Sequence, residues 1–218
     1  MATGKHYVML ATLGLAACQS EKIAATATTS TSTTRDTAER GKDANDVPTA
    51  TQPSSSRATL QLSGMADRQA IAAVRAEAAR QEMTRVTIAS TQSFNVTEGG
   101  RIVAALVTGR GNLPNTDLNG CFVATRQGSE TMLIPTLGYG DYELEPCARP
   151  LAVGLLSSSA STAKLGLVFG SYSREGNETV PIVINWDRSN NTLLIDDAMS
   201  TKASQVGAQT IAAMKKLL

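Results

Sequence analysis

Histidine is almost absent from this chain: its 218 residues include only His6. Ser-His-Asp and Cys-His mechanisms need an imidazole base, and zinc sites commonly use imidazole ligands. His6 falls in a segment that we expect to be removed, so the mature chain contains no histidine. The composition therefore excludes most familiar hydrolase chemistry. We expect a protein that is not an enzyme and carries no cofactor and no metal ion.

An excess of charge of either sign is also missing. The chain has 20 Lys and Arg against 19 Asp and Glu, charged residues make up 18%, and aromatic residues make up only 4%. A nucleic-acid-binding protein needs clustered basic residues to neutralise phosphates, and a polybasic membrane-surface protein needs them to meet anionic lipids. We therefore expect no nucleic-acid partner.

Long hydrophobic runs are lacking too. The apolar run over residues 7–15 is too short for a bilayer core, which needs about 20 helical residues. It follows Lys5 and ends in Leu15-Ala16-Ala17-Cys18. A charged start, an apolar stretch and small residues before a cleavage site are typical of a signal peptide, here residues 1–17.

A cysteine directly after Leu-Ala-Ala resembles the lipobox of bacterial lipoproteins. The resemblance implies that cleavage precedes Cys18 and that Cys18 is lipidated, palmitate being a typical acyl group. Gln19, in place of an Asp that would favour the inner membrane, implies an outer-membrane lipoprotein facing the periplasm. The alternative is an ordinary secretory signal with an incidental cysteine.

Only three cysteines are present. If Cys18 is lipidated, Cys121 and Cys147 remain, and an oxidising envelope favours a disulfide between them. Closing a loop of about 27 residues is worth about 3.5 kcal/mol by the chain-entropy estimate. A catalytic or metal-binding dithiol is the alternative, and the wide spacing and the missing histidine disfavour it.

The composition divides the mature chain into three parts. Residues 18–60 look like a disordered tether, because Ser, Thr and Ala fill 23 of the 40 positions 20–59. Residues 61–85 predict a helix, with strong helix formers and Ser63 or Asp67 as N-cap. That helix either lies on the following domain or serves as a stalk or docking helix for a partner. Residues 86–218 predict a β-rich domain with a C-terminal helix.

Apolar residues alternate with a period of two through much of 86–198, most clearly at 165–170 and 179–187. Other predicted strands are 86–96, 101–108, 121–127, 131–137, 151–156 and 192–196. Pro181 cannot donate to a ladder, so strand 179–187 is expected at an edge or to begin there. We expect a mainly β, α+β fold: an antiparallel sandwich or small barrel of about eight strands, flanked by an N-terminal and a C-terminal helix. The last helix, from about Ser200, should bring Ile211, Met214 and Leu218 to one face.

Two motifs have structural explanations that we favour over catalysis. Ser161 and Lys164 match the S-x-x-K pattern of penicillin-binding enzymes, but a serine-rich loop and a strand surround them instead of a helix start. Asp141, Glu143 and Glu145 alternate as if on one face of a strand. They either solvate an edge strand or form a site for a cation or for acid/base work, with Asp196-Asp197 as a second acidic spot.

Three of the four tyrosines lie in two glycine-rich segments, 137–142 and 169–176. Gly170-Ser171-Tyr172, beside a predicted hairpin, resembles the protruding loops of periplasmic lysozyme inhibitors. Because tyrosine offers a large contact area and a hydroxyl at low entropic cost, we expect a partner-binding edge at Tyr139, Asp141, Tyr142, Ser171 and Tyr172. The resemblance implies that the partner is a lysozyme-like cell-wall hydrolase, and the protein its inhibitor or an immunity protein against it. One alternative is that these tyrosines only cap the fold. Another is an accessory lipoprotein of an envelope secretion or assembly complex, and a third is an enzyme that uses carboxylates around Asp141.

Overall fold

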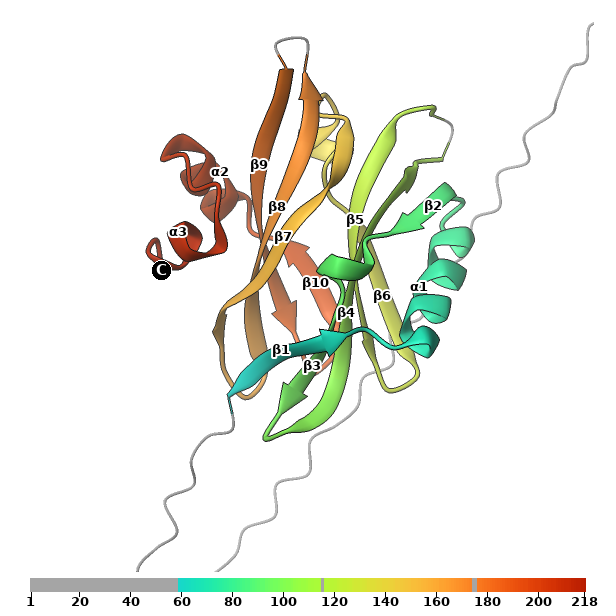
Figure 1. The fold of residues 1–218 in the computed structure, drawn as a ribbon, viewed down its shortest axis with the longest axis vertical. Coiled ribbons are helices and arrows are strands. Elements are labelled where there is room, and N and C mark those ends of the chain that lie inside the picture. Colours follow the sequence, from blue (N-terminus) through green and yellow to red (C-terminus); the bar gives the residue numbers. More distant parts are fainter. Residues whose placement is uncertain (1–58, 115, 174–175) are drawn as a thin grey trace, which may run out of the picture. The chain divides into compact units, whose positions relative to one another are not determined.

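A computed structural model describes residues 59–114, 116–173 and 176–218. The signal peptide, Cys18 and the tether up to residue 58 lie outside the described residues. The described strands form two antiparallel sheets that share no strand, and helices cover both outer faces (Figure 1). The expected mainly β, α+β fold is confirmed, as a sandwich and not as a closed barrel.

The first sheet has six strands and carries the N-terminal helix. Its path runs β1 (Leu60–Met65), β3 (Phe94–Glu98), β4 (Arg101–Asn112), β5 (Asn119–Gln127) and β6 (Glu130–Pro135), and β2 (Thr84–Ile88) also pairs with β4. Helix α1 (Arg68–Arg80) packs Ala70, Val74 and Ala78 against the outer face of this sheet. Asp67 caps the helix by accepting a hydrogen bond from the Ala70 N–H at 2.7 Å. The helix therefore lies on its own domain.

The expected helix over 61–85 is too long at both ends. Residues 60–65 pair with β3, a partner about 34 residues away that local propensity does not reveal. Beyond Arg80 the chain turns, and Glu82 takes a left-handed φ of 59°. Residues 84–88 then join β4 as β2, and the turn η1 (Ser90–Gln92) separates β2 from β3 where one strand was expected.

The second sheet has four strands in the order β10 (Thr192–Ile195), β9 (Gly176–Asp187), β8 (Thr162–Ser173) and β7 (Cys147–Ser158). Its outer face is covered by α2 (Asp197–Gln205) and α3 (Ile211–Lys215). One C-terminal helix was expected, but the chain turns at Gly207, whose φ is +66°. Met214 is buried and Ile211 half-buried under α3, whereas Leu218 is 55% exposed and does not join them.

The main core lies between the sheets, and most of its large side chains come from the second sheet. Leu165, Leu167 and Phe169 of β8 and the fully buried Trp186 of β9 point into it. Val168 points the other way, toward α2 and α3. Both faces of β8 are therefore buried, as expected for an inner strand covered on both sides.

The expected disulfide is confirmed. Cys121 of β5 and Cys147 at the start of β7 are bonded, with their Cα atoms 5.3 Å apart. Neither residue is exposed. The bond links one sheet to the other, so it fixes how the two halves of the sandwich meet at this end.

The expectation that 179–187 lies at an edge is wrong for the strand as a whole, because β9 lies between β8 and β10. The short β10 reaches only to Ile184 on β9, however. Beyond it, the Val183 N–H donates to Ser200 Oγ of α2 at 2.9 Å. The nitrogen of Pro181 lies on that same side of the strand, since alternate residues share an orientation. The proline therefore removes no ladder bond.

Candidate functional site

The two tyrosine-bearing segments, 30 residues apart in sequence, meet at one end of the sandwich. The first forms the turn η2 (Gly140–Tyr142) in the connection from β6 to β7, and the second is the end of β8 at its hairpin with β9. The Tyr172 N–H donates to the Pro146 carbonyl at 3.2 Å, and Ser171 Oγ donates to the same oxygen at 3.1 Å. In Figure 1 the yellow β6–β7 connection accordingly lies beside the end of β8.

The five residues expected to bind a partner divide into two groups. Tyr139 and Tyr172 are 55% and 53% exposed, and Asp141 is exposed as well. Ser171 is buried, and Tyr142 packs against the core between the sheets. The first three are therefore available to a partner, whereas Ser171 and Tyr142 hold the loops in place.

Tyr142 sits among groups that oppose its ionisation. Burial raises the pKa of its hydroxyl, a hydrogen bond with Ser200 of α2 works against that shift, and nearby carboxylates add to it. Tyr142 thus stays neutral and links the connection between β6 and β7 to the helix layer.

The acidic residues of this connection do not form a strand, contrary to the alternation seen in the sequence. Asp141 belongs to η2, and Glu143 and Glu145 follow it in a turn. Asp141 and Glu143 are exposed, but Oε2 of Glu145 is buried with no hydrogen-bond partner among the described residues. Burial, with Glu178 nearby, raises the pKa of Glu145. Within the described ranges no three His, Cys, Asp or Glu side chains are grouped to hold a metal ion.

Two exposed leucines, which the sequence did not single out, lie on connections at the end of the sandwich that carries the tyrosines. Leu144 is 90% exposed, and Leu118, in the loop between β4 and β5, is 49% exposed. The β6–β7 connection lies beside the start of β5, directly after Leu118, because a Cβ placed on Gly138 would lie 2.9 Å from the carbonyl oxygen of Asn119. We call Leu118, Tyr139, Leu144 and Tyr172 the end surface. The signal that could have found Leu144 is an isolated leucine between two glutamates in a turn-forming segment.

Acidic side chains accompany the end surface. Those exposed on the same loops and on the adjoining end of β9 are Asp117, Asp141, Glu143 and Glu178. Exposed apolar and aromatic side chains and exposed carboxylates are therefore found on the same connections of the fold.

The residues of the S-x-x-K match and of the acidic pair Asp196-Asp197 take part in structural contacts. Ser161 lies in the hairpin between β7 and β8, so Ser161 and Lys164 do not share a helix. Lys164 forms an ion pair with Asp196 at 2.5 Å, and Asp196 also caps α2 by accepting from the Met199 N–H. Burial opposes the charge of Asp196, but these hydrogen bonds outweigh it and lower the pKa of its carboxyl.

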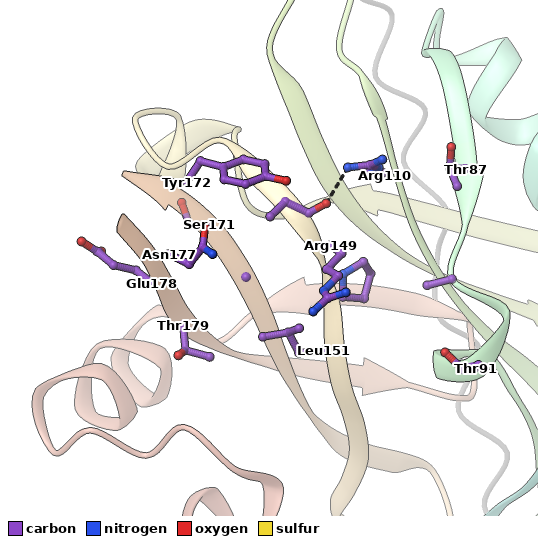
Figure 2. Close-up of a pocket in the computed structure, with 14 residues that line it drawn as sticks. Thr87, Thr91, Arg110, Arg149, Leu151, Ser171, Tyr172, Asn177, Glu178 and Thr179 are labelled. Carbon is purple, nitrogen blue, oxygen red and sulfur yellow. Dashed lines mark hydrogen bonds between the residues drawn. The ribbon is translucent and has the colours of Figure 1, made fainter. Parts of the chain in front are cut away.

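A groove of about 680 Å³ begins at Tyr172 and runs along β7 toward β2 (Figure 2). Its charged lining residues are Arg110 of β4, Arg149 of β7 and Glu178 of β9. Figure 2 shows Arg110 on the β4 side and Glu178 on the far side, with Tyr172 and Arg149 between them. Sequence reasoning did not single out either arginine, because the fold alone brings these residues together.

No protein-family model matches the chain, and no curated protein and no solved structure is significantly similar to it. Among the helices that the structure describes, none combines the length and the apolar character needed to cross a membrane.

Proposed function

We propose that this chain is a non-catalytic protein-binding module whose end surface contacts the partner. The observation that carries the proposal is the set of exposed side chains Leu118, Tyr139, Leu144 and Tyr172, all 49% exposed or more, on the β4–β5 and β6–β7 connections and at the end of β8. Scattered exposed apolar residues are ordinary, but tyrosines on neighbouring segments supply large contact areas at low entropic cost. The Cys121–Cys147 bond and the Pro146 contacts hold these loops before a partner arrives, which limits the entropy lost on binding.

The chemistry of the end surface favours a partner with basic groups around an apolar contact. The acidic side chains Asp117, Asp141, Glu143 and Glu178 would steer such a partner and exclude acidic ones. In its sharpest form, the proposal is an inhibitor or immunity protein against a lysozyme-like cell-wall hydrolase. It acts in the periplasm, and a lipid on Cys18 anchors it to the outer membrane. The lipobox-like sequence and the disulfide support an oxidising envelope compartment.

An accessory role in an envelope complex is less well supported. In that role the N-terminal helix would dock on the complex. Its apolar residues Ala70, Val74 and Ala78 are already buried against the sheet, so they are not free to contact a partner.

The test is lysis of cell-wall suspensions by a purified lysozyme-type hydrolase, with and without the protein. Leu144→Ala and Tyr172→Ala should each weaken inhibition about thirtyfold, the effect of losing about 2 kcal/mol at an interface, while the melting temperature stays unchanged. Leu194→Ala is the matched control, since Leu194 is 63% exposed but lies on β10, outside the end surface. Inhibition should also weaken as salt screens the acidic side chains.

Two results would contradict the proposal at different levels. A wild-type protein that leaves every tested hydrolase fully active removes the inhibitor assignment. Equal loss in Leu144→Ala and Leu194→Ala removes the end surface as the contact region.

The anchor is tested separately through Cys18. Cys18→Ser should release the protein from the membrane fraction and abolish labelling by a radioactive fatty acid, because the acyl chains supply the attachment. A variant that stays with the membrane, together with a wild type that takes up no label, would show that the lipobox interpretation is wrong.

A further inference from the structure

The groove along β7 differs in character from the end surface, with which it shares only Tyr172. It is lined by Thr87, Thr91 and Thr179, by Asn177 and by two arginines, so polar donors surround it from both sheets. Its volume of about 680 Å³ lies in the range of small-molecule sites, roughly 300–1,000 Å³.

Arg110 is a half-buried cation with no counter-ion among the described residues. The ion pairs found there are Arg80–Glu77, Lys164–Asp196 and Arg188–Glu98. Its Nη1 instead donates to the Ala148 carbonyl of β7 at 2.7 Å (Figure 2). That bond uses one of the five N–H donors of the guanidinium and fixes its orientation, and the rest remain for water or a ligand. Removing an unpaired cation from water is costly, so an anion placed here would be favoured.

Arg149 adds a second positive charge to the same groove. It is exposed, lies on β7 opposite Gly170 of β8, and forms none of those ion pairs. A Cβ added to Gly170 would be in ordinary contact with Ala148 and Leu151 at 3.6 Å, so Gly170 lies on the wall of the groove beside Arg149. Glu178 lies at the far side of the groove from Arg110 (Figure 2), which leaves the arginine side the positive one.

The edge of β7 is poorly suited to receiving another strand. It carries Pro150, which has no N–H, and its register shifts three times along its pairing with β8. Prolines and bulges are features that protect an edge from strand addition. The groove is therefore better suited to a compact ligand than to an extended peptide.

We propose that this groove binds a small anionic ligand, whose carboxylate or phosphate groups pair with Arg110 and Arg149. Planar guanidinium groups match both kinds of oxyanion in a bidentate geometry. The surrounding threonine hydroxyls and the Asn177 amide would satisfy the remaining oxygens. The inference does not depend on the partner proposed for the end surface.

The test is an NMR titration of the ¹⁵N-labelled full-length chain with sodium succinate and, separately, with inorganic phosphate. Sodium chloride keeps the ionic strength constant. The Nε–Hε signals of Arg110 and Arg149 should shift together and saturate with one of the two anions, which identifies the oxyanion preferred. Arg110→Gln and Arg149→Gln should each weaken that binding about tenfold or more, the loss expected for one charge-assisted contact. Arg75→Gln, on the exposed face of α1, is the matched control and should bind normally.

Three results would overturn the inference. One is the absence of a saturating shift with either anion. Another is equal weakening in Arg75→Gln, which would indicate general charge screening. The third is full binding by both groove variants. The anion titration and the lysis assay are independent measurements. A protein that binds neither anion could still inhibit the hydrolase, so this outcome would not affect the function proposed for the end surface.

Discussion

At the scale of single residues, Asn191 connects the two sheets. It is buried at 4% exposure and takes a left-handed φ of 50°, a conformation that asparagine tolerates better than most side chains. Its Oδ1 accepts from Thr125 Oγ1 of β5 at 2.8 Å and from Trp186 Nε1 of β9 at 3.3 Å. One amide therefore satisfies a buried polar group on each sheet.

Asn191→Ala should lower the free energy of unfolding by about 2–3 kcal/mol, because it leaves the indole N–H and the threonine hydroxyl unpaired in the core. Urea denaturation followed by the fluorescence of Trp186 measures it. Asn190→Ala, at the exposed neighbouring position, should cost little. Similar losses in both variants would show that the turn, and not the buried amide, is responsible.

Glu145 should lower the stability of the folded protein as the pH rises, the opposite of what an ion-paired carboxylate does. Burial raises the pKa of its carboxyl in the folded state, so the folded protein is penalised above that pKa. The penalty disappears as the pH falls below the ordinary value of the unfolded chain, about 4.3. Glu145→Gln should therefore stabilise the protein at pH 7 by about 1 kcal/mol or less, since solvent screens a half-buried group. The difference should vanish near pH 4.

Thermal unfolding across this pH range checks the prediction. Glu143→Gln, at an exposed position in the same turn, serves as its control. A stability gain from Glu145→Gln that persists at pH 3 would mean that lost charge is not its cause.

At the scale of elements, the local sequence pattern predicted which segments form strands better than it predicted the residues at which those strands begin and end. The alternation at 165–170 and 179–187 falls within β8 and β9. Alternate residues of these strands point into the core between the sheets and toward the C-terminal helices. The expected helix over 61–85 is too long at its end because Gln81, Glu82 and Met83 are good helix formers, and too long at its start because β1 forms only through its pairing with β3. Pro181 marked a real gap in the ladder, but the sequence did not show that α2 would fill it.

The docking of α3 depends on a missing side chain in β7. A Cβ at Gly154 would lie 2.5 Å from Cγ2 of Ile211, whereas one at Gly170, on the same sheet, would be in ordinary contact at 3.6 Å. Gly154→Ala should cost about 1–3 kcal/mol by displacing α3. Gly170→Ala should cost much less. Hydrogen exchange of the amides of residues 211–215 together with the melting temperature tests this. Unchanged protection in Gly154→Ala would show that Ile211 repacks freely.

At the scale of the whole molecule, the disulfide is a constraint between sheets. Reduction should lower the free energy of unfolding by about 3.5 kcal/mol, because the unfolded chain loses its closed loop. In a chain carrying Cys18→Ser, thiol titration in denaturant should find no free thiol before reduction. Two reactive thiols in the denatured protein after purification in air would contradict it.

The candidate site was only partly predictable because it is assembled by the fold. The scarcity of aromatic residues singled out Tyr139 and Tyr172 in the sequence. Leu144 and Leu118 were not singled out from the sequence, because their exposure depends on the turn after η2 and on the connection between β4 and β5. Arg110 and Arg149 are separated by a whole hairpin and share a groove only because β7 passes over β4.

The helices on both outer faces restrict where this protein can change over evolutionary time. With α1 over one sheet and α2 and α3 over the other, substitutions on the sheet faces disturb packing, whereas those at exposed end positions such as Leu118, Tyr139 and Leu144 disturb it far less. Under the proposed binding function, related proteins with different targets should therefore diverge mainly at exposed positions such as Leu118, Tyr139 and Leu144, whereas the core-packed Tyr142 should persist. For the same reason, a library randomised at those positions should yield mostly folded molecules, and the scaffold could be redirected without redesign of its interior.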